Sequence, residues 1–540
     1  MTDFSAYVGR WIALAGDEVA GVGFTGEEAL HMARQNRYKA RLTVQYVDDP
    51  AGEALALSPL LERLRPLLVQ SSQPVYLVGG AVRDALLGRY TNDLDFVLPQ
   101  GAIKLAFQIG DALGEPAYVL DRERDTGRVV LPGQETYLDF ARFRGPDLLT
   151  DLRERDFSIN AMALPATAVT RAAIIDPFGG QEDLQDGRIR LVNDHALQDD
   201  PVRGLRAVRL AASLNFTLTP ETETAVQQAA PLLSTVSVER IRDELVKMLA
   251  TAVPDQAIRQ METLGLLPII LPEIAALATV TQSPPHHEPV LAHTLSVLRW
   301  LVFVEACLAE ERPSAPELAS LQTMLAPFAE SLRVHLARVV DGGLDGRTLL
   351  RWGALFHDVG KKETQTVEDD GRIRFLGHDQ VGAEMTISRL RQLHLSSQAS
   401  KFVKRIVYGH MRPMLLANTG RPVSRRAVFR FYRDTGAAGL DICLLSLADH
   451  LAMYDGVGDE AAWERLVGVT AVLLQNYFEE HDKTVAPVAL VDGHTLIKEL
   501  NLQPGPEVGR LLRLIQEAQA AGDISTMAEA VAFARQSHEK

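Results

Sequence analysis

The spacing of apolar positions divides the chain into a short mixed segment, an α/β segment and a long helical remainder. In residues 6–48 two strand-like stretches precede a helical one, and a third strand-like stretch closes the segment. Thr25 suits the cap of that helix, because acidic residues follow it in the first turn. We therefore expect residues 1–55 to form a small separate ββαβ module with a structural or interaction role. Its strands are expected at Tyr7–Ala15, Val19–Phe24 and Arg41–Val47.

A mixed pattern of strands and helices begins at Pro74 and gives way to helical spacing alone beyond about Gln185. Short apolar stretches bounded by turn residues predict strands at Val75–Val78, Leu94–Leu98, Arg128–Leu131 and Tyr137–Arg142. The predicted fold is multidomain and mainly α. After the N-terminal module we expect an α/β head at residues 60–185, an all-helical neck at 186–280, a helical domain at 286–455 and a helical tail at 456–540.

Composition narrows the class of protein. Of the 540 residues, 46% are apolar and 23% charged, as in ordinary globular proteins with several domains. Two cysteines, Cys307 and Cys443, exclude a disulfide framework or a cysteine zinc site and favour the reducing cytoplasm. The sequence has no signal-peptide pattern and no apolar stretch of membrane-spanning length, so we expect no membrane partner. A net charge of −15 argues against RNA binding over the whole surface, but not against a local basic site.

The segment Leu77–Asp84 predicts a phosphate-binding turn between a strand and a helix. Backbone amides at Gly79 and Gly80 suit phosphate oxygens, and Arg83 lies within reach of a triphosphate. A plain tight turn would contain the same two glycines.

The next strand begins with two aspartates, Asp93 and Asp95, whose side chains point to the same side because residues two apart in a strand share a face. Two carboxylates held together repel unless a cation joins them, and oxygen ligands beside a phosphate substrate suit Mg²⁺. Two such ions would activate a primer hydroxyl and stabilise the leaving pyrophosphate. Asp139, on a later strand, is either a third catalytic carboxylate or an exposed strand residue.

Four further motifs follow in order, and together with the turn and the aspartate pair they closely resemble class II tRNA nucleotidyltransferases and bacterial poly(A) polymerases. These motifs are Arg155–Ala163, Asp176–Gly180 with Asp183 and Leu184, Asp199–Arg209 and Ser237–Leu245. The resemblance implies a polymerase-β-like head in which Asp93 and Asp95 hold the metal ions. It also implies a nucleotide-binding set, consisting of Gly79, Gly80, Arg83, Arg155, Asp200, Arg203, Arg206 and Arg209.

The sequence departs from the family pattern at two positions. Glu154 stands where the family usually has Arg, which weakens any role for a paired arginine there. Asp199 replaces the family's Glu and keeps its charge.

A physical argument for base selection rests on Asp200 and Arg203. Asp200 and Pro201 are expected to begin a helix with an apolar stripe at Leu205, Val208 and Ala212 and an adjoining basic stripe. A capped, solvated basic helix would show the same pattern. If this helix faces the nucleotide, one carboxylate acceptor and one guanidinium donor match the edge shared by cytosine and adenine, and leave uracil and guanine unpaired.

Histidines and aspartates in the helical region form a second constellation, whose imidazole and carboxylate ligands suit divalent metals. It comprises His293, His357, Asp358, His378, His410 and Asp449. It resembles the HD phosphohydrolase superfamily. That resemblance implies that His293, His357, Asp358 and Asp449 ligate one metal ion, such as Mg²⁺, Mn²⁺ or Ni²⁺, and that His378 and His410 hold a second. It also implies hydrolysis of phosphate esters, including 2′,3′-cyclic phosphates, with Lys361 near the substrate phosphate. His286 and His287 are interpreted as loop residues.

The tail resembles the same family at Leu490–Leu500 and Leu502–Leu512, so the resemblance covers most of residues 60–535. Before it, basic residues alternate with aromatic ones. This mixture is expected either for RNA contact or for a solvated helix face. The residues are Lys401, Lys404, Arg405, Arg421, Arg425, Arg426, Arg430 and Arg433, with Phe429, Phe431 and Tyr432.

The leading hypothesis is an enzyme that adds C, or C and A, to the 3′ end of tRNA, with CTP and ATP as substrates. The alternatives are a poly(A) polymerase, an HD phosphohydrolase whose head only binds nucleotide, and a non-catalytic RNA-binding protein. In the family, full CCA enzymes usually carry a long mobile loop before the motif that starts at Arg155, and here only Gly145–Glu154 precede it. We therefore expect an enzyme that adds C well and A poorly, unless Asp121–Gly127 replaces the missing loop.

Overall fold

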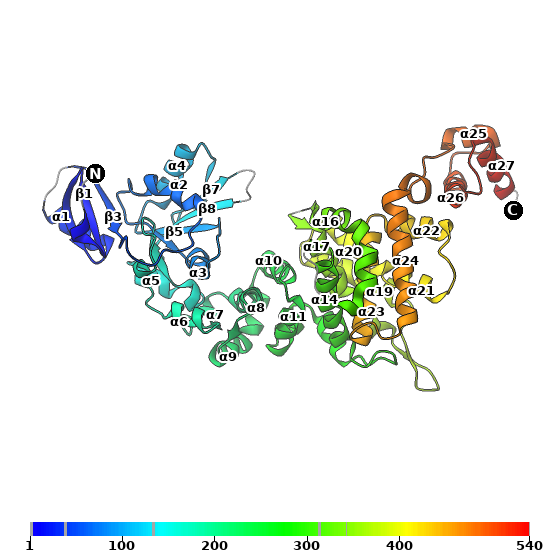
Figure 1. Cartoon of the computed structure of the whole chain (residues 1–540), viewed down its shortest axis with the longest axis horizontal. Helices are drawn as coiled ribbons and strands as arrows, with labels where there is room; N and C mark the ends of the chain where they lie inside the picture. Colours follow the sequence, from blue (N-terminus) through cyan, green and yellow to red (C-terminus); the bar gives the residue numbers. More distant parts are fainter. Residues whose placement is uncertain (1–3, 37–39, 132–135, 311–314, 342, 539–540) are drawn as a thin grey trace. The chain divides into compact units, whose positions relative to one another are not determined.

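The computed structural model describes residues 4–36, 40–131, 136–310, 315–341 and 343–538. The chain forms two compact units, Met1–Leu232 and Leu233–Lys540. The predicted multidomain, mainly helical architecture is confirmed: the larger sheets lie in the first unit, and helices dominate the second (Figure 1).

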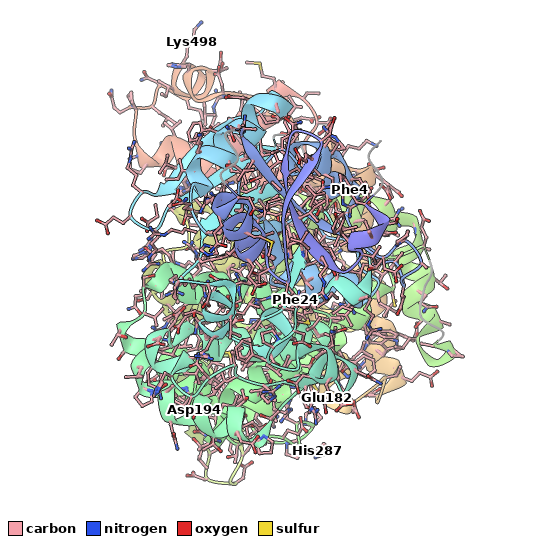
Figure 2. The ribbon with its side chains drawn as sticks, turned by 90° about the vertical axis from the view of Figure 1, so that its left-hand side faces the viewer. Phe4, Phe24, Glu182, Asp194, His287 and Lys498 are labelled. Carbon is pink, nitrogen blue, oxygen red and sulfur yellow. The ribbon has the colours of Figure 1, made fainter. Side chains whose placement is uncertain are left out.

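The N-terminal segment has the predicted ββαβ order. Strands β1 (Arg10–Ala15), β2 (Glu18–Gly23) and β3 (Leu42–Val47) form an antiparallel sheet in the order β2-β1-β3, and helix α1 (Gly26–Gln35) packs on it. Thr25 caps α1 as expected, in a reciprocal capping box with Glu28. Phe24, directly before the cap, lies at the surface with 73% of its area exposed (Figure 2).

The head contains a six-stranded mixed sheet in the order β6-β7-β8-β5-β4-β9. Neighbouring strands are antiparallel except β5 and β8, which run parallel. The strands are β4 (Tyr76–Val78), β5 (Leu94–Leu98), β6 (Ala117–Asp121), β7 (Thr126–Leu131), β8 (Thr136–Arg142) and β9 (Ala163–Pro165).

Different elements cover the two faces of this sheet. One face packs against α2 (Pro59–Leu68) and α4 (Ala102–Leu113) in a large apolar core. On the other face the N-terminal module covers β4, β5 and β9, and Trp11 packs against Tyr76 with ring centroids 5.1 Å apart. The module therefore shares its core with the head, in the same compact unit.

Two strands of the six-stranded sheet, β6 and β9, were not predicted from the sequence pattern. The outward residues of β6, Tyr118 and Leu120, are apolar but exposed, which hides the alternation that marks a half-buried strand. Strand β9 has only three residues, all buried, so it offers no alternation.

Short helices follow the sheet in the first unit: α5 (Leu148–Arg153), α6 (Gly180–Gln185), α7 (Ala196–Asp199), α8 (Val202–Leu214) and α9 (Pro220–Ala229). Asp200 is extended, between α7 and α8, and Pro201 caps the helix, which therefore begins one residue later than predicted. Leu205 and Val208 of α8 are buried as predicted, and Arg203, Arg206 and Arg209 line its half-exposed side.

The second unit begins with α10 (Val238–Leu249) and α11 (Pro254–Thr263). A helical domain follows, whose principal helices are α14 (Val290–Ala306), α17 (Gly346–Phe356), α19 (His378–Gln392), α20 (Ser397–Gly409), α22 (Arg425–Thr435) and α23 (Ala438–Tyr454). Helix α24 (Glu460–Glu479) leads to the tail helices α25 (Gly493–Leu500), α26 (Pro506–Ala521) and α27 (Met527–His538). Within the described ranges no single helix is long and apolar enough to cross a membrane, and the one pair that meets these criteria jointly, α22 with α23, is bent by 105°.

Candidate functional site

Backbone pairing brings two of the predicted carboxylates side by side in the head. Asp95 on β5 is the register partner of Asp139 on the parallel strand β8. Asp93 directly precedes β5, two residues before Asp95, and is exposed. The three carboxylates therefore belong to one face of the sheet.

The electrostatics of this group favour a bound cation. Surrounding protein atoms raise the pKa of the Asp95 carboxyl, although the residue remains accessible to solvent. Arg155 opposes that rise, whereas the negative charges of Asp139 and Asp93 add to it. Because a divalent cation would relieve the repulsion among these oxygens, the donor set fits the Mg²⁺ ions expected here.

Asp139 is also bound by an arginine. Its two carboxylate oxygens each accept a 2.7 Å hydrogen bond from Arg128, its cross-strand partner on β7. This bidentate pair fixes the Asp139 carboxylate beside Asp95. Of the two interpretations drawn from the sequence, the geometry favours membership of the carboxylate group over an isolated strand residue.

The glycine turn directly adjoins the carboxylates. Gly79 has φ +72°, and a Cβ on it would lie 3.3 Å from Arg155 Nη1 and 3.7 Å from Asp95 Oδ2. A side chain there would fill the space beside the carboxylate and would be strained. Arg83, in α3 (Gly80–Leu86), donates to Asn160 Oδ1 at 2.9 Å, and this hydrogen bond orients its guanidinium.

Helix α5 positions Arg155 through a residue that the sequence analysis missed. Asp151 is 1% exposed and accepts hydrogen bonds from Arg155 Nε at 3.2 Å and Nη2 at 3.0 Å. The same carboxylate accepts from the Arg144 amide at 3.1 Å. The sequence signal that could have revealed this contact is the four-residue spacing of Asp151 and Arg155 at the end of α5.

The arginines of α8 are held by backbone and carboxylate acceptors. Arg203 donates to the Glu154 carbonyl at 2.9 Å and lies 3.9 Å from Asp200. Because the first contact uses the backbone, the departure at Glu154 does not remove it. Burial would raise the pKa of Asp156, but Arg206, 2.9 Å away, holds it below its usual value. Arg209 lies one turn beyond Arg206 on the same half-exposed side of α8.

In the second unit the predicted histidines converge from separate helices. His293 comes from α14, His357 and Asp358 follow α17, and His378 begins α19. Asp449 on α23 lies 2.9 Å from His293 Nε2. Nδ1 of three histidines contacts a backbone carbonyl three residues earlier, so Nε2 is the ring atom left to act as a ligand, and the Nε2 atoms of His378 and His410 lie 3.2 Å apart. These contacts are His357 with Ala354 at 2.7 Å, His378 with Phe375 at 2.8 Å and His410 with Val407 at 2.6 Å.

Asp358 lies at the centre and belongs to two candidate metal groups. One combines it with His293 and His357, the other with His378 and His410, and within each group the ligand atoms lie within 4.8 Å of one another. Lys361 Nζ lies 2.7 Å from Asp358 Oδ2. A carboxylate shared between two groups of imidazoles is the arrangement expected for a bridged pair of metal ions.

The charge states of this centre suit metal binding. Burial and the neighbouring His357 and His378 lower the pKa of His410 to about 3, so His410 is neutral and able to ligate. Burial would raise the pKa of Asp358, but His357 and Lys361 hold it well below its usual value. The buried Nε2 of His357 lies 3.1 Å from Asp358 Oδ2, so two candidate ligand atoms of this group face each other.

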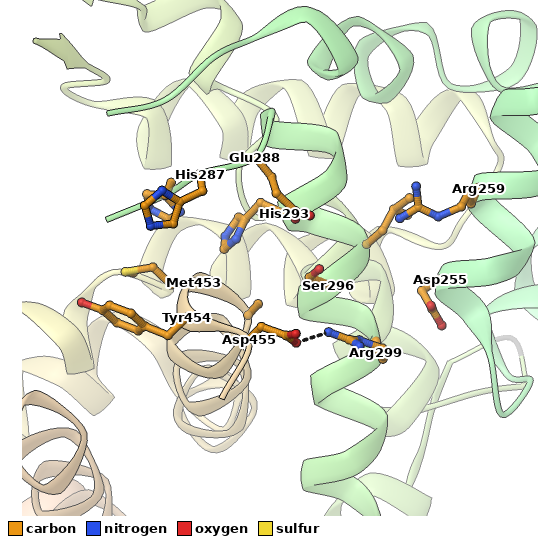
Figure 3. A pocket seen from close by; sticks show the side chains of 13 residues that line it. Asp255, Arg259, His287, Glu288, His293, Ser296, Arg299, Met453, Tyr454 and Asp455 are labelled. Carbon is orange, nitrogen blue, oxygen red and sulfur yellow. Dashed lines mark hydrogen bonds and ion pairs between the residues drawn. The ribbon is translucent and has the colours of Figure 1, made fainter. Parts of the chain in front are cut away.

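His286, interpreted from the sequence as a loop residue, belongs to the surroundings of the metal centre. Its ring stands edge-on to that of His293, with centroids 4.7 Å apart, and burial lowers its pKa to about 4. Both histidines line a pocket of about 560 Å³ (Figure 3). A second pocket of about 390 Å³ lies over Asp358 and Asp449 and is lined by Lys361 and Arg372. The sequence signal for this role of His286 was the adjacent pair His286 and His287 shortly before α14.

The basic and aromatic stretch does not provide an RNA-stacking surface. Phe429, Phe431 and Tyr432 are buried. Arg430 and Arg433 of α22 instead contact Glu517 of the tail helix α26. This stretch therefore attaches the tail to α22, and Lys401, Lys404 and Arg405 line a separate shallow pocket on α20.

A head with paired carboxylates on adjacent strands, beside a phosphate-binding turn, and a histidine–aspartate metal centre in a helical domain define a nucleotidyltransferase with an HD domain. Three family models match: the poly A polymerase head domain at residues 75–190, the probable RNA and SrmB-binding site of polymerase A at 215–277, and the HD domain at 326–454. The chain is 34% identical to the A-adding tRNA nucleotidyltransferase of Deinococcus radiodurans, over 87% of this chain and 97% of that protein. It is also 34% identical to the CC-adding tRNA nucleotidyltransferase of Thermus thermophilus, over 84% and 92%.

The chain thus belongs to the tRNA nucleotidyltransferase family, and it is an enzyme of the CCA-adding type. Solved structures agree on the fold. A CCA-adding enzyme in complex with ATP has a TM-score of 0.56 at 20% identity, covering 89% of this chain and 95% of that one. The Thermotoga maritima CCA-adding enzyme in complex with tRNA has a TM-score of 0.53 at 20% identity, covering 89% and 96%. Nucleotidyltransferase heads and HD domains of this kind use divalent metals.

We predict that Asp358→Asn removes both metal ions from the HD centre, because this carboxylate is common to both groups. His378→Ala should remove one ion and leave the group around His293. Metal content after loading with Mn²⁺ and gel filtration measures the difference, and His287→Ala, an exposed neighbour of the centre, is the matched control. Retention of an ion by Asp358→Asn, in a protein that melts like wild type, contradicts the bridged arrangement.

Proposed function

We propose that this enzyme adds C residues to the 3′ end of tRNA without a nucleic-acid template, and adds the terminal A poorly or not at all. The observation that carries the proposal is the short connection between β8 and α5. β8 ends at Arg142 and α5 begins at Leu148. Asp147 caps α5 through the Thr150 amide at 2.8 Å, and the Arg144 amide is bonded to Asp151, so the connection is tied at both ends.

This connection lies where the resemblance places the long mobile loop of full CCA enzymes. A loop of that kind rearranges groups around the nucleotide, and a tied five-residue connection lacks the length to do so. The alternative segment, Asp121–Gly127, forms the turn between β6 and β7. Within it Asp125 accepts from the amides of Gly101, Ala102 and Ile103 at 2.7, 3.0 and 3.0 Å, and this anchors the turn to α4. That segment therefore does not supply a mobile replacement.

The relatives include both kinds of partial activity. The A-adding enzyme of Deinococcus radiodurans and the CC-adding enzyme of Thermus thermophilus are equally identical to this chain, so identity alone does not decide between them. The short β8–α5 connection favours the CC-adding activity. A poly(A) polymerase, which would also require efficient A addition, is disfavoured for the same reason.

In this proposal Asp93, Asp95 and Asp139 would hold Mg²⁺ ions, whose positive charge would lower the pKa of the primer hydroxyl and offset the charge of the leaving pyrophosphate. Gly79 and Gly80 admit the triphosphate beside the carboxylates, because any side chain at Gly79 would occupy that space. Arg83 and Arg155 donate to its phosphate oxygens.

The incoming base is bound at α8. Asp200 and Arg203 present an acceptor and a donor to it, and Arg206 and Arg209 extend the basic side of that helix. Two free, buried cysteines fit a role in the cytoplasm.

The CC-only proposal predicts the product directly. Incubation of tRNA that lacks its CCA end with CTP and ATP together should yield ends that stop after C. Sequencing of the tRNA ends measures this, and Asp95→Asn, which should reduce addition to background, shows that the activity belongs to the head. Efficient formation of complete CCA ends would refute the proposal.

Base selection at α8 predicts a change in fidelity as well as in rate. Asp200 and Arg203 match the hydrogen-bonding edge of cytosine and adenine and mismatch that of uracil and guanine. Asp200→Ala and Arg203→Ala remove this mismatch, so discrimination against UTP and GTP should fall by roughly tenfold or more. Competition between CTP and UTP during a single turnover measures the ratio. A slower enzyme with unchanged discrimination argues against base readout by this pair.

We also propose that the HD centre hydrolyses phosphate esters, 2′,3′-cyclic phosphates among them. Six preorganised ligands and a pocket lined by Lys361 and Arg372 support this role. His357→Ala is expected to abolish hydrolysis and to leave C addition within about twofold of wild type, since the two centres lie in different compact units. Assays on 2′,3′-cyclic AMP and on tRNA, run on the same preparation, test the separation. The HD proposal fails if the metal-loaded wild type hydrolyses no phosphate ester.

A further inference from the structure

The face of the head sheet that carries the catalytic carboxylates is only partly covered. The N-terminal module packs over β4, β5 and β9 on that face, where Tyr76, Val78 and Val97 are buried. Helix α4 covers β6, β7 and β8 on the opposite face (Figure 1). Within the described part of the head, the side chains on the β6–β8 part of the carboxylate-bearing face are exposed or half-buried, and this part of the face is called open below.

Register places this open strip directly beside the carboxylates. Across the strands, Tyr118 is the partner of Arg128, Arg128 of Asp139, and Asp139 of Asp95. Partners in register share a face, so Tyr118 belongs to the same row as the candidate metal ligands. One step along, Tyr137 pairs with Val130 and, by continuation of the β5–β8 register, stands opposite Asp93.

The strip is aromatic and exposed. Tyr118, Leu120 and Tyr137 have 54%, 49% and 40% of their areas exposed. The Arg128 guanidinium lies over the Tyr137 ring, 4.7 Å from its centroid, while it holds Asp139 on its other side. Single exposed apolar residues are common, but three on one open face beside catalytic carboxylates are not explained by folding.

We propose that this strip, Tyr118, Leu120, Arg128, Val130 and Tyr137, binds the single-stranded 3′ end of the RNA primer. The terminal base stacks on Tyr137, and this would bring the 3′-hydroxyl of the primer to the metal ions at Asp93 and Asp95. The preceding base reaches Tyr118. The inference rests on the proposed function, because template-independent addition requires the primer end to be held without a complementary strand. Aromatic rings with a stacked arginine suit this task, since every base has a flat face.

The kinetic test separates primer binding from nucleotide binding. Tyr137→Ser and Tyr118→Ser should raise the KM for tRNA by roughly tenfold each and leave the KM for CTP within about twofold. Tyr137→Phe keeps the ring and should behave like wild type. Phe107→Ser is the matched control, because Phe107 is an aromatic residue with the same 40% exposure on α4, which covers the opposite face.

A binding test does not depend on turnover. A tRNA that ends in 2-aminopurine should lose fluorescence on binding to wild type, Tyr137→Phe and Phe107→Ser, but not to Tyr137→Ser. If Tyr137→Ser quenches the probe and keeps the wild-type KM for tRNA, the inference is overturned while C addition stands. If wild type adds nothing to tRNA yet quenches the probe in the Tyr137-dependent manner, the proposed function fails and the primer site remains.

Discussion

The need to hold carboxylates in fixed positions beside other charged or ligating groups is the constraint around which both candidate centres are built. In the head, backbone pairing places Asp95 beside Asp139, and two arginines, Arg128 and Arg155, partly offset the negative charge. In the HD domain, Asp358 is buried among imidazoles and Lys361. In the head the protein leaves a deficit of positive charge that a divalent cation would complete, and in the HD domain it gathers buried ligand atoms that a divalent cation would join.

The surroundings of the head carboxylates are unusually well fixed. Asp151 ties Arg155 and the Arg144 amide to α5, and the core of the N-terminal module includes Phe143, directly after β8, and Leu152 of α5. The module therefore has a physical role, since it covers the β4, β5 and β9 part of the face that carries the candidate carboxylates and packs against the β8–α5 connection, where the family resemblance places a long mobile loop in full CCA enzymes. A site with this rigidity suits one kind of nucleotide better than a switch between two.

Much of the candidate chemistry was visible in the sequence because it depends on local order. The two-residue spacing of Asp93 and Asp95, the double-glycine turn and the adjacent His357 and Asp358 are short-range patterns with a direct geometric meaning. The length of the segment before Arg155 was likewise evident, and the structure adds that it is tied down. Asp151 and His286 were missed, because their importance comes from what they contact and not from how they are spaced.

The sequence by itself determined the strand that carries the candidate catalytic pair, the helical character of the remainder and the order of the candidate ligands, since periodicity and turn residues act over a few positions. Only the tertiary structure decided that Asp139 joins Asp95, that one aspartate unites two groups of histidines, and that Phe429 and its aromatic neighbours are buried. These outcomes depend on strand order and on helix packing between residues far apart in the chain. Local spacing carries no information about which strands become neighbours, and for this reason the open face beside the carboxylates emerged only from the folded sheet.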